Sequence, residues 1–123
     1  TAVLAAPKPS CTDLQNVVSD GVTTDANGNT IEAWSVVDKF ADTTAEDGTV
    51  TTKAEHETAY TASIVADKET SIRNDRDRRI ALTDWTASTD VTMTAEMTTY
   101  RQALRDVPAQ AGFPNTITWP EAP

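Results

Sequence analysis

Residues 83–123 read TDWTASTDVTMTAEMTTYRQALRDVPAQAGFPNTITWPEAP, and they contain the clearest structural pattern in the chain. Between residues 93 and 107 its large apolar side chains recur every third or fourth position, at Met93, Met97, Tyr100, Leu104 and Val107. An α-helix turns about 100° per residue, so these positions share one narrow face. The spacing predicts an amphipathic helix over about 93–107, with Thr92 as its N-cap and Pro108 as its end.

Aromatic residues flank this predicted helix on both sides. Trp85 stands before it, while Phe113 and Trp119 follow it. Large aromatic side chains supply much of the buried area in a small domain. We therefore expect them to close over the apolar face, with Trp85 packed against Tyr100 and Leu104.

The composition leaves little material for a core. The chain has 123 residues, of which 38% are hydrophobic and 6% aromatic, which suits one small domain. A chain of this size buries a modest fraction of its surface even when it is compact. We therefore expect part of its stability to come from a partner or from self-association.

Charge and cysteine content argue against several classes of function. The net charge is −9, from 10 basic and 19 acidic residues, so nucleic acid is not expected as a partner. Binding its phosphates requires clustered Lys and Arg side chains. Cys11 is the single cysteine, so no internal disulfide can form. No run approaches the roughly 18 apolar residues of a membrane-spanning helix, so no membrane partner is expected.

The first forty residues predict an arm followed by a hairpin. Two prolines favour an extended arm over 1–11, which docks on a neighbour or lies on its own domain. The Asn-Gly pair at 27–28 predicts a hairpin with strands over about 17–24 and 30–38. The Asp-Gly pair at 20–21 predicts a bulge or a second turn. Two strands alone are marginally stable in water, so this hairpin needs a third strand, a helix or another chain.

A long helix is predicted after a turn-rich segment at 41–50. Thr52 and Glu55 have the spacing of a capping box, and residues 53–82 contain neither Pro nor Gly. Its apolar residues are few and scatter around the helix, which indicates a mostly solvated element. Ion pairs one turn apart are expected between Arg73 and Asp77 and between Asp75 and Arg79.

These elements predict an α+β fold with an N-terminal β-hairpin, one long helix, a second shorter amphipathic helix and an extended C-terminal tail. The alternation in TITW, residues 116–119, adds a short strand to that tail. Residues 1–50 are expected to hold the arm and hairpin, and 51–123 the helical region, within one compact unit overall.

No set of residues predicts catalysis, a cofactor or a bound metal. One cysteine and one histidine, His56, cannot supply a zinc site, and neither an EF-hand spacing nor a phosphate-binding glycine loop occurs. The acidic residues of the second half lie among Arg and Thr and are interpreted as ion-pairing groups, not as an acid and base: Asp75, Asp77, Asp84 and Asp90. We expect no enzymatic activity.

Arg101 and Arg105 lie one turn apart at the edge of the apolar face. Surface arginines commonly lie over apolar neighbours. The alternative is that one or both bind Asp84 or Asp90 and lock the TDW loop to the helix.

The tryptophans allow two roles as well, either in the core or as anchors for a partner, because Trp, Tyr and Arg dominate binding hot spots. The candidate residues for partner binding or structural anchoring are Trp85, Tyr100, Arg101, Leu104, Arg105, Phe113 and Trp119.

Three motifs stand out in the last third of the chain: TDW at 83–85, YRQALRDVPAQAGFP at 100–114 and WPEAP at 119–123. Together with the basic run before them they cover about 73–123. Over this range the chain resembles the C-terminal signature of bacteriophage tail assembly chaperone proteins, a family associated with tail-fibre morphogenesis. The first half of the chain carries no comparably specific motif.

The resemblance implies a non-enzymatic protein of phage tail morphogenesis. As an assembly chaperone it would bind a tail-fibre or baseplate protein and cover apolar or strand-edge surface until assembly is complete. The alternative is a stoichiometric virion component, a tail-fibre or baseplate adaptor or tip protein that remains in the particle. The implied location is the host cytoplasm during assembly or the virion tail. The thin core adds self-association through the long helix and the hairpin as an expectation.

Overall fold

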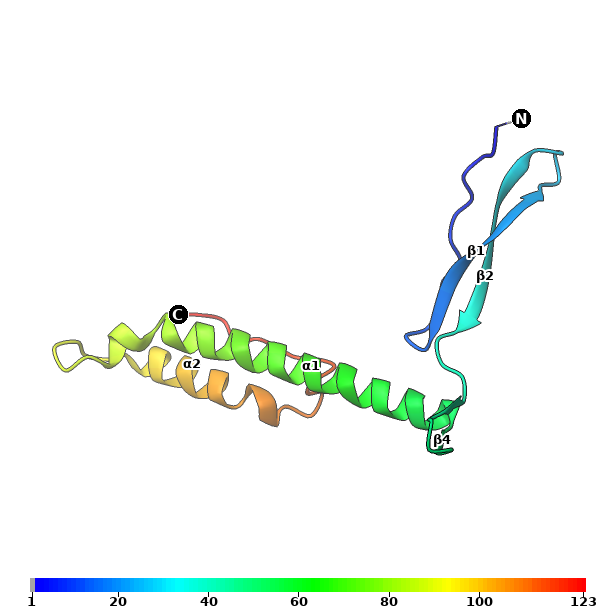
Figure 1. Cartoon of the computed structure of the whole chain (residues 1–123). Helices are drawn as coiled ribbons and strands as arrows, with labels where there is room; N and C mark the ends of the chain where they lie inside the picture. Colours follow the sequence, from blue (N-terminus) through cyan, green and yellow to red (C-terminus); the bar gives the residue numbers. More distant parts are fainter. Residues whose placement is uncertain (1) are drawn as a thin grey trace. The chain divides into compact units, whose positions relative to one another are not determined.

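The computed structural model of the protein describes residues 2–123, and Thr1 lies outside the described residues. It shows the predicted α+β fold, with an N-terminal antiparallel hairpin, a long helix and a shorter second helix (Figure 1). The chain forms two compact units, Thr1–Ala59 and Tyr60–Pro123, and the boundary falls inside the long helix.

The first unit is built on an antiparallel hairpin of β1 (Gln15–Thr24) and β2 (Thr30–Asp38). Both predicted strands are confirmed, and β1 begins two residues earlier than expected. The pairing register shifts between Ser19 and Val22, which confirms the predicted bulge. Gly21 has a φ of +84°, a conformation that side chains with a Cβ rarely adopt.

The loop that joins the two strands is closed by one carboxylate. Oδ1 of Asp25 accepts hydrogen bonds from the backbone N–H groups of Asn27, at 2.8 Å, and Asn29, at 2.9 Å. Gly28 takes the left-handed conformation with φ +84°. The side-chain hydrogen bond from Asn29 is the main reason that the pKa of Asp25 lies below its ordinary value.

The N-terminal arm lies on its own hairpin, which decides between the two predicted roles for residues 1–11. The N–H of Leu4 donates to the Thr30 carbonyl at 2.9 Å, and the N–H of Glu32 donates to the Leu4 carbonyl at 3.1 Å. Nε1 of Trp34 donates to the carbonyl of Ala6 at 3.2 Å. The arm therefore supplies a partial third strand along the outer side of β2.

A second, minimal hairpin lies in the turn-rich segment at 41–50. Its strands are β3 (Thr43–Thr44) and β4 (Val50–Thr51). Gly48 has a φ of +85°, and the side chain of Asp47 accepts the N–H of Thr49 at 2.9 Å. The turns agree with that composition, but the two strands were not predicted because two-residue strands carry no periodicity.

The long helix α1 (Lys53–Ala81) begins with the predicted capping box. The N–H of Thr52 donates to Oε2 of Glu55 at 2.8 Å, and the N–H of Glu55 donates to Oγ1 of Thr52 at 3.3 Å. Among the described residues of α1 none is buried, which agrees with the predicted solvated helix.

One of the two predicted ion pairs of α1 is confirmed and the other is wrong. Arg79 binds Asp75 at 3.2 Å. Arg73 does not bind the carboxylate that follows it by one turn, and instead binds Glu69 at 2.8 Å, one turn before it. An acidic residue N-terminal to its basic partner is the better orientation on a helix, because it also suits the helix dipole.

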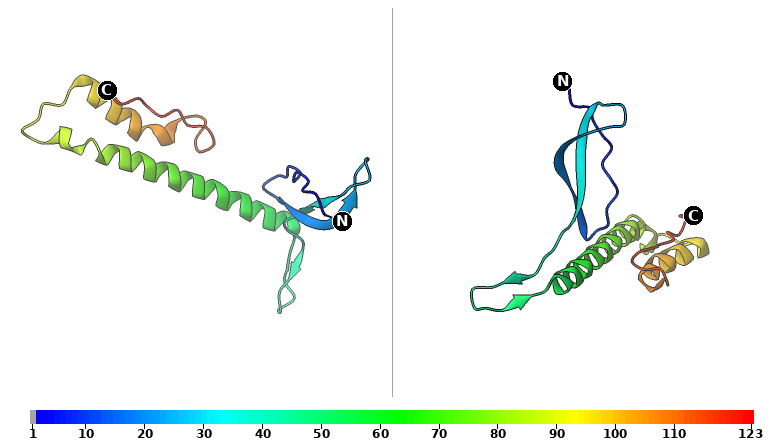
Figure 2. Two further views of the ribbon diagram at one scale, coloured as in Figure 1. Left: turned by 90° about the horizontal axis from the view of Figure 1, so that it is seen from above. Right: turned by 90° about the vertical axis from the view of Figure 1, so that its right-hand side faces the viewer.

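The second helix α2 (Ala95–Arg105) is shorter than predicted at both ends. The predicted N-cap Thr92 is wrong, because Thr94 supplies the hydroxyl that accepts the N–H of Met97 at 3.1 Å. Val107 belongs to the following 3-10 turn η2 (Val107–Ala109), where Pro108 lies. α2 lies beside the second half of α1 (Figures 1 and 2).

The core of the second unit confirms the predicted apolar face. Leu104 and Val107 are fully buried, and Tyr100 is nearly so. Met93 and Met97, which continue the face toward the N-terminus, are only partly buried. The core therefore sits under the C-terminal half of α2 and the turn after it.

The C-terminal tail runs back along both helices without forming the predicted strand at 116–119. The side chain of Gln110 takes the place of a neighbouring strand. Its Nε2 donates to the carbonyl of Thr118 at 2.8 Å, and its Oε1 accepts the N–H of Thr118 at 2.9 Å. Gly112 is required in the turn before it, because a Cβ there would lie 2.6 Å from the carbonyl oxygen of Thr116.

Candidate partner-binding site

Arg101 is a buried charge that ties α2 to the end of α1. It is 8% exposed, and its Nη1 donates to Oγ1 of Thr83 at 2.6 Å, to Oδ1 of Asp84 at 3.1 Å and to the carbonyl of Ile80 at 3.4 Å. The Ile80 carbonyl belongs to the last turn of α1, where a positive charge also suits the helix dipole. We refer to these four residues as the arginine clamp.

The clamp confirms, for Arg101, one of the two roles predicted for Arg101 and Arg105. Arg101 locks the TDW loop to α2, and it does so through a single guanidinium nitrogen and not through a two-pronged fork. Arg105 is exposed, and no ion pair within residues 2–123 involves it or Asp90. The sequence could not rank the two arginines, because their spacing places both at the edge of the same face.

Trp85 is 65% exposed, so the prediction that it packs against Tyr100 and Leu104 is wrong. It lies in the 3-10 turn η1 (Asp84–Ala87). Residues three apart eclipse one another in a 3-10 turn, and here Thr83 and Thr86 take the buried side. Oγ1 of Thr86 donates to the carbonyl of Thr83 at 2.6 Å.

The same turn thus presents Trp85 to solvent. The inward threonines were missed by the sequence reasoning, although their spacing of three was a usable signal.

The connection between the helices gathers the exposed large apolar side chains of the second unit. They are Leu82, Trp85 and Val91, which we call the anchor patch. Asp84 and Asp90 adjoin the patch in sequence, and Asp84 is 63% exposed on its side chain even while it accepts from Arg101. The connection therefore carries three exposed apolar side chains, with two carboxylates next to them in the sequence.

Two arginines of α1 hold the aromatic residues of the tail. The guanidinium of Arg73 lies 5.1 Å from the ring centre of Phe113, and that of Arg79 lies 4.3 Å from the ring of Trp119. Cations favour the faces of aromatic rings at such distances. Phe113 and Trp119 are half-buried and thus act as attachment points of the tail to α1.

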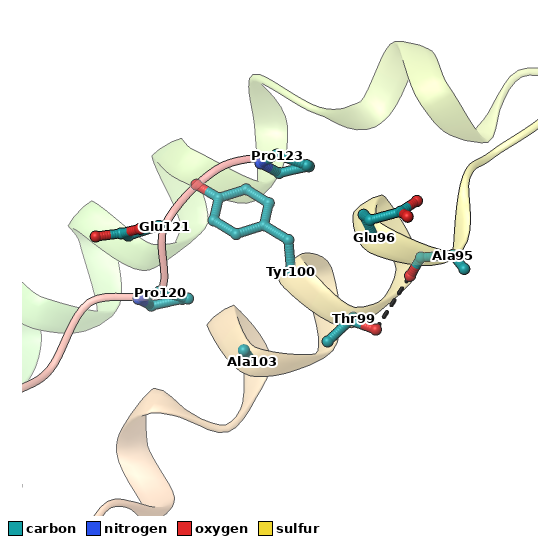
Figure 3. A pocket seen from close by; sticks show the side chains of 8 residues that line it. All are labelled: Ala95, Glu96, Thr99, Tyr100, Ala103, Pro120, Glu121 and Pro123. Atoms are coloured by element: carbon teal, nitrogen blue, oxygen red, sulfur yellow. Dashed lines mark hydrogen bonds between the residues drawn. The ribbon is translucent and has the colours of Figure 1, made fainter.

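A shallow groove of about 480 Å³ lies between α2 and the end of the tail. Figure 3 shows Tyr100 crossing from α2 toward the tail, with its ring near Pro120 and Pro123. Glu96 and Glu121 are the charged residues of its lining. The groove offers one aromatic face, a threonine hydroxyl and two carboxylates.

The described residues hold no cluster of three or more His, Cys, Asp or Glu that could bind a metal ion. No helix among residues 2–123 is long and apolar enough to cross a membrane. Cys11 is a free, exposed thiol, and His56 contacts the hydroxyl of Thr43 at 2.8 Å.

Residues 69–123 match the family model of the phage tail assembly chaperone proteins. The match agrees with the resemblance that the motifs of the last third of the chain carry, and it supports a role in tail assembly. The matched segment contains the arginine clamp, the anchor patch and the whole of the tail. No curated protein and no solved structure matches the chain.

Proposed function

We propose that the protein is a non-enzymatic chaperone of phage tail assembly that binds a tail-fibre or baseplate protein through the anchor patch. The observation that carries the proposal is the exposed Trp85, fixed beside a buried arginine clamp inside the segment that matches the family. A tryptophan buries a large apolar area on binding while it fixes only two side-chain torsions, which suits a hot spot.

The chemistry of the patch defines its partner. Leu82, Trp85 and Val91 require an apolar pocket, and the carboxylates of Asp84 and Asp90 favour Lys or Arg at its rim. A tail protein with such a pocket exposes apolar surface before it meets its neighbours in the particle. Covering that surface in the host cytoplasm prevents premature association until assembly proceeds.

The test is capture of the tail-fibre and baseplate proteins of the same phage by the purified full chain, with affinities measured by calorimetry. Trp85→Ala should weaken binding by about 30-fold or more, as expected for a hot-spot tryptophan. Its free energy of unfolding should change by less than about 0.5 kcal/mol, because the side chain is exposed. Val50→Ala, which trims an exposed apolar residue outside the patch, is the matched control.

Equal affinity of the wild type and Trp85→Ala for the captured tail protein would overturn the assignment of the patch. Mass spectrometry of purified virions separates a chaperone from the alternative, a structural component. A chaperone should be absent from finished particles, whereas a structural component should remain at fixed copy number.

A further inference from the structure

The outer side of β1 is an open strand edge. β1 pairs with β2 on one side, the arm lies along β2, and nothing within residues 2–123 pairs with the other side of β1. An open edge presents a row of backbone N–H and C=O groups that can pair with another strand. This edge belongs to the first unit, which the family match does not reach.

The hydrogen bonds at the two ends of the hairpin show which groups face outward. The N–H of Lys39 donates to the Leu14 carbonyl at 2.9 Å, and the N–H of Asp25 donates to the Asn29 carbonyl at 3.0 Å. Bonded and non-bonded pairs alternate along an antiparallel ladder. Counting from each end through the register, the backbone groups that point away from β2 belong to Val17, Ser19, Val22 and Thr24.

This edge lacks most of the features that block pairing. Natural edge strands are commonly protected by Lys, Pro or short length. β1 has ten residues with neither Lys nor Pro, and its protective features are the bulge and the single charge of Asp20. Exposed valines lie on both faces of β1 itself, at Val18 and Val22. An added strand would therefore gain apolar contacts on either face as well as backbone hydrogen bonds.

We propose that an extended strand of the bound tail protein adds to the open edge of β1. Charge distinguishes this occupant from a second copy of the chain. Asp20 lies in the middle of the edge, exposed, with its carboxylate held by the Ser35 hydroxyl at 2.6 Å. In a symmetric pairing of two copies in which Ser19 faces Val22 and Val17 faces Thr24, the two Asp20–Gly21 segments would meet at the centre and bring their carboxylates together. A partner strand with Lys or Arg opposite Asp20 has no such repulsion.

This inference rests on the proposed function, because the strand is assigned to the tail protein captured by the anchor patch. The direct test is hydrogen exchange by NMR on the full chain, alone and with the captured tail protein. In the complex, the outward amides of Val17, Ser19 and Val22 should exchange at least about tenfold more slowly. The amide of Val18, which already faces β2, should change little and serves as the internal control.

A backbone variant tests the same edge by affinity. Val17→Pro removes one outward donor and no bond to β2, and proline is tolerated in edge strands at such positions. It should weaken binding of the tail protein by about tenfold or more, whereas Val17→Thr, which keeps the N–H, should change it little. If Val17→Pro changes the exchange rates of the other hairpin amides, Asp20→Lys is the variant to use instead. It should weaken binding of the tail protein, and the loss should become smaller as the salt concentration rises.

The outcomes separate this inference from the proposed function. Loss of binding on Trp85→Ala, with normal binding of Val17→Pro and Asp20→Lys and no protection of the outward amides, overturns strand addition alone. Failure of the wild type to capture any tail protein overturns both. Protection of the outward amides in the pure chain, increasing with its concentration, would replace the partner strand with a second copy.

Discussion

Different interactions stabilise the interior of each of the two units. Among the described residues up to 59 no side chain is buried, and the first unit relies on its strand ladder, its turns and the arm. The second unit buries a small cluster of side chains beneath α2, namely Thr83, Thr86, Tyr100, Arg101, Leu104 and Val107. Because the first unit is stabilised mainly by backbone hydrogen bonds, its apolar side chains and one strand edge stay accessible to a partner.

The largest effect should come from removing the centre of the second unit. Leu104→Ala is expected to lower the free energy of unfolding by about 2–5 kcal/mol, because Leu104 is fully buried and the cavity cannot collapse completely. Urea denaturation measures it, and Leu82→Ala, at an exposed position, is the control. A change below about 0.5 kcal/mol for Leu104→Ala would show that the second unit lacks the core described above.

The next effect concerns the arginine clamp. Arg101→Ala should destabilise the second unit by about 1.5–3 kcal/mol, the range for hydrogen bonds to charged groups, and should loosen the loop that carries Trp85. Arg105→Ala, one turn away and exposed, should cost much less. Equal losses in the two variants would mean that the clamp contributes no more than a surface charge.

A smaller effect is expected from the attachment of the arm in the first unit. Trp34→Phe removes the hydrogen bond from Nε1 to the Ala6 carbonyl and should cost about 0.5–1.5 kcal/mol. The amide of Leu4 should then exchange faster, whereas amides in α2 should keep their rates. Unchanged exchange at Leu4 would show that the arm is held by its backbone bonds alone.

The smallest effect is a dependence on pH in the hairpin loop. The pKa of Asp25 is below its ordinary value, so its stabilising contribution is complete above about pH 4 and is lost as pH falls through the lowered folded-state pKa. Asn29→Ala removes the principal hydrogen bond and should raise the pKa of Asp25 toward the ordinary value. An NMR titration of the carboxyl group that gives the same pKa in both proteins would contradict this account.

Sequence patterns predicted the parts of this fold that are periodic or have distinctive turn residues. The spacing of Tyr100 and Leu104, the capping box at Thr52 and the Gly21 bulge each follow from local rules, and each is confirmed. The exposure of Trp85 could not be deduced, because it depends on which side of a four-residue turn faces the core.

The conformation of the C-terminal tail could not be predicted from the sequence pattern either. Alternation at 116–119 predicts a strand, but a strand needs a backbone neighbour, and the fold supplies the side chain of Gln110 instead. Of the seven candidate site residues, the structure places Tyr100, Arg101 and Leu104 in the interior and Trp85 at the surface. Their roles toward a partner remain the proposals made above.

The arginine clamp has a consequence for behaviour in concentrated salt. Arg101 is buried, and two of its three acceptors, the Thr83 hydroxyl and the Ile80 carbonyl, are uncharged groups. Salt screens exposed charges much more strongly than buried ones. The loop that presents Trp85 should therefore keep its conformation at high ionic strength, while the attraction between its exposed carboxylates and a basic partner weakens. Salt would then release a partner that is held by charge without unfolding the surface that held it.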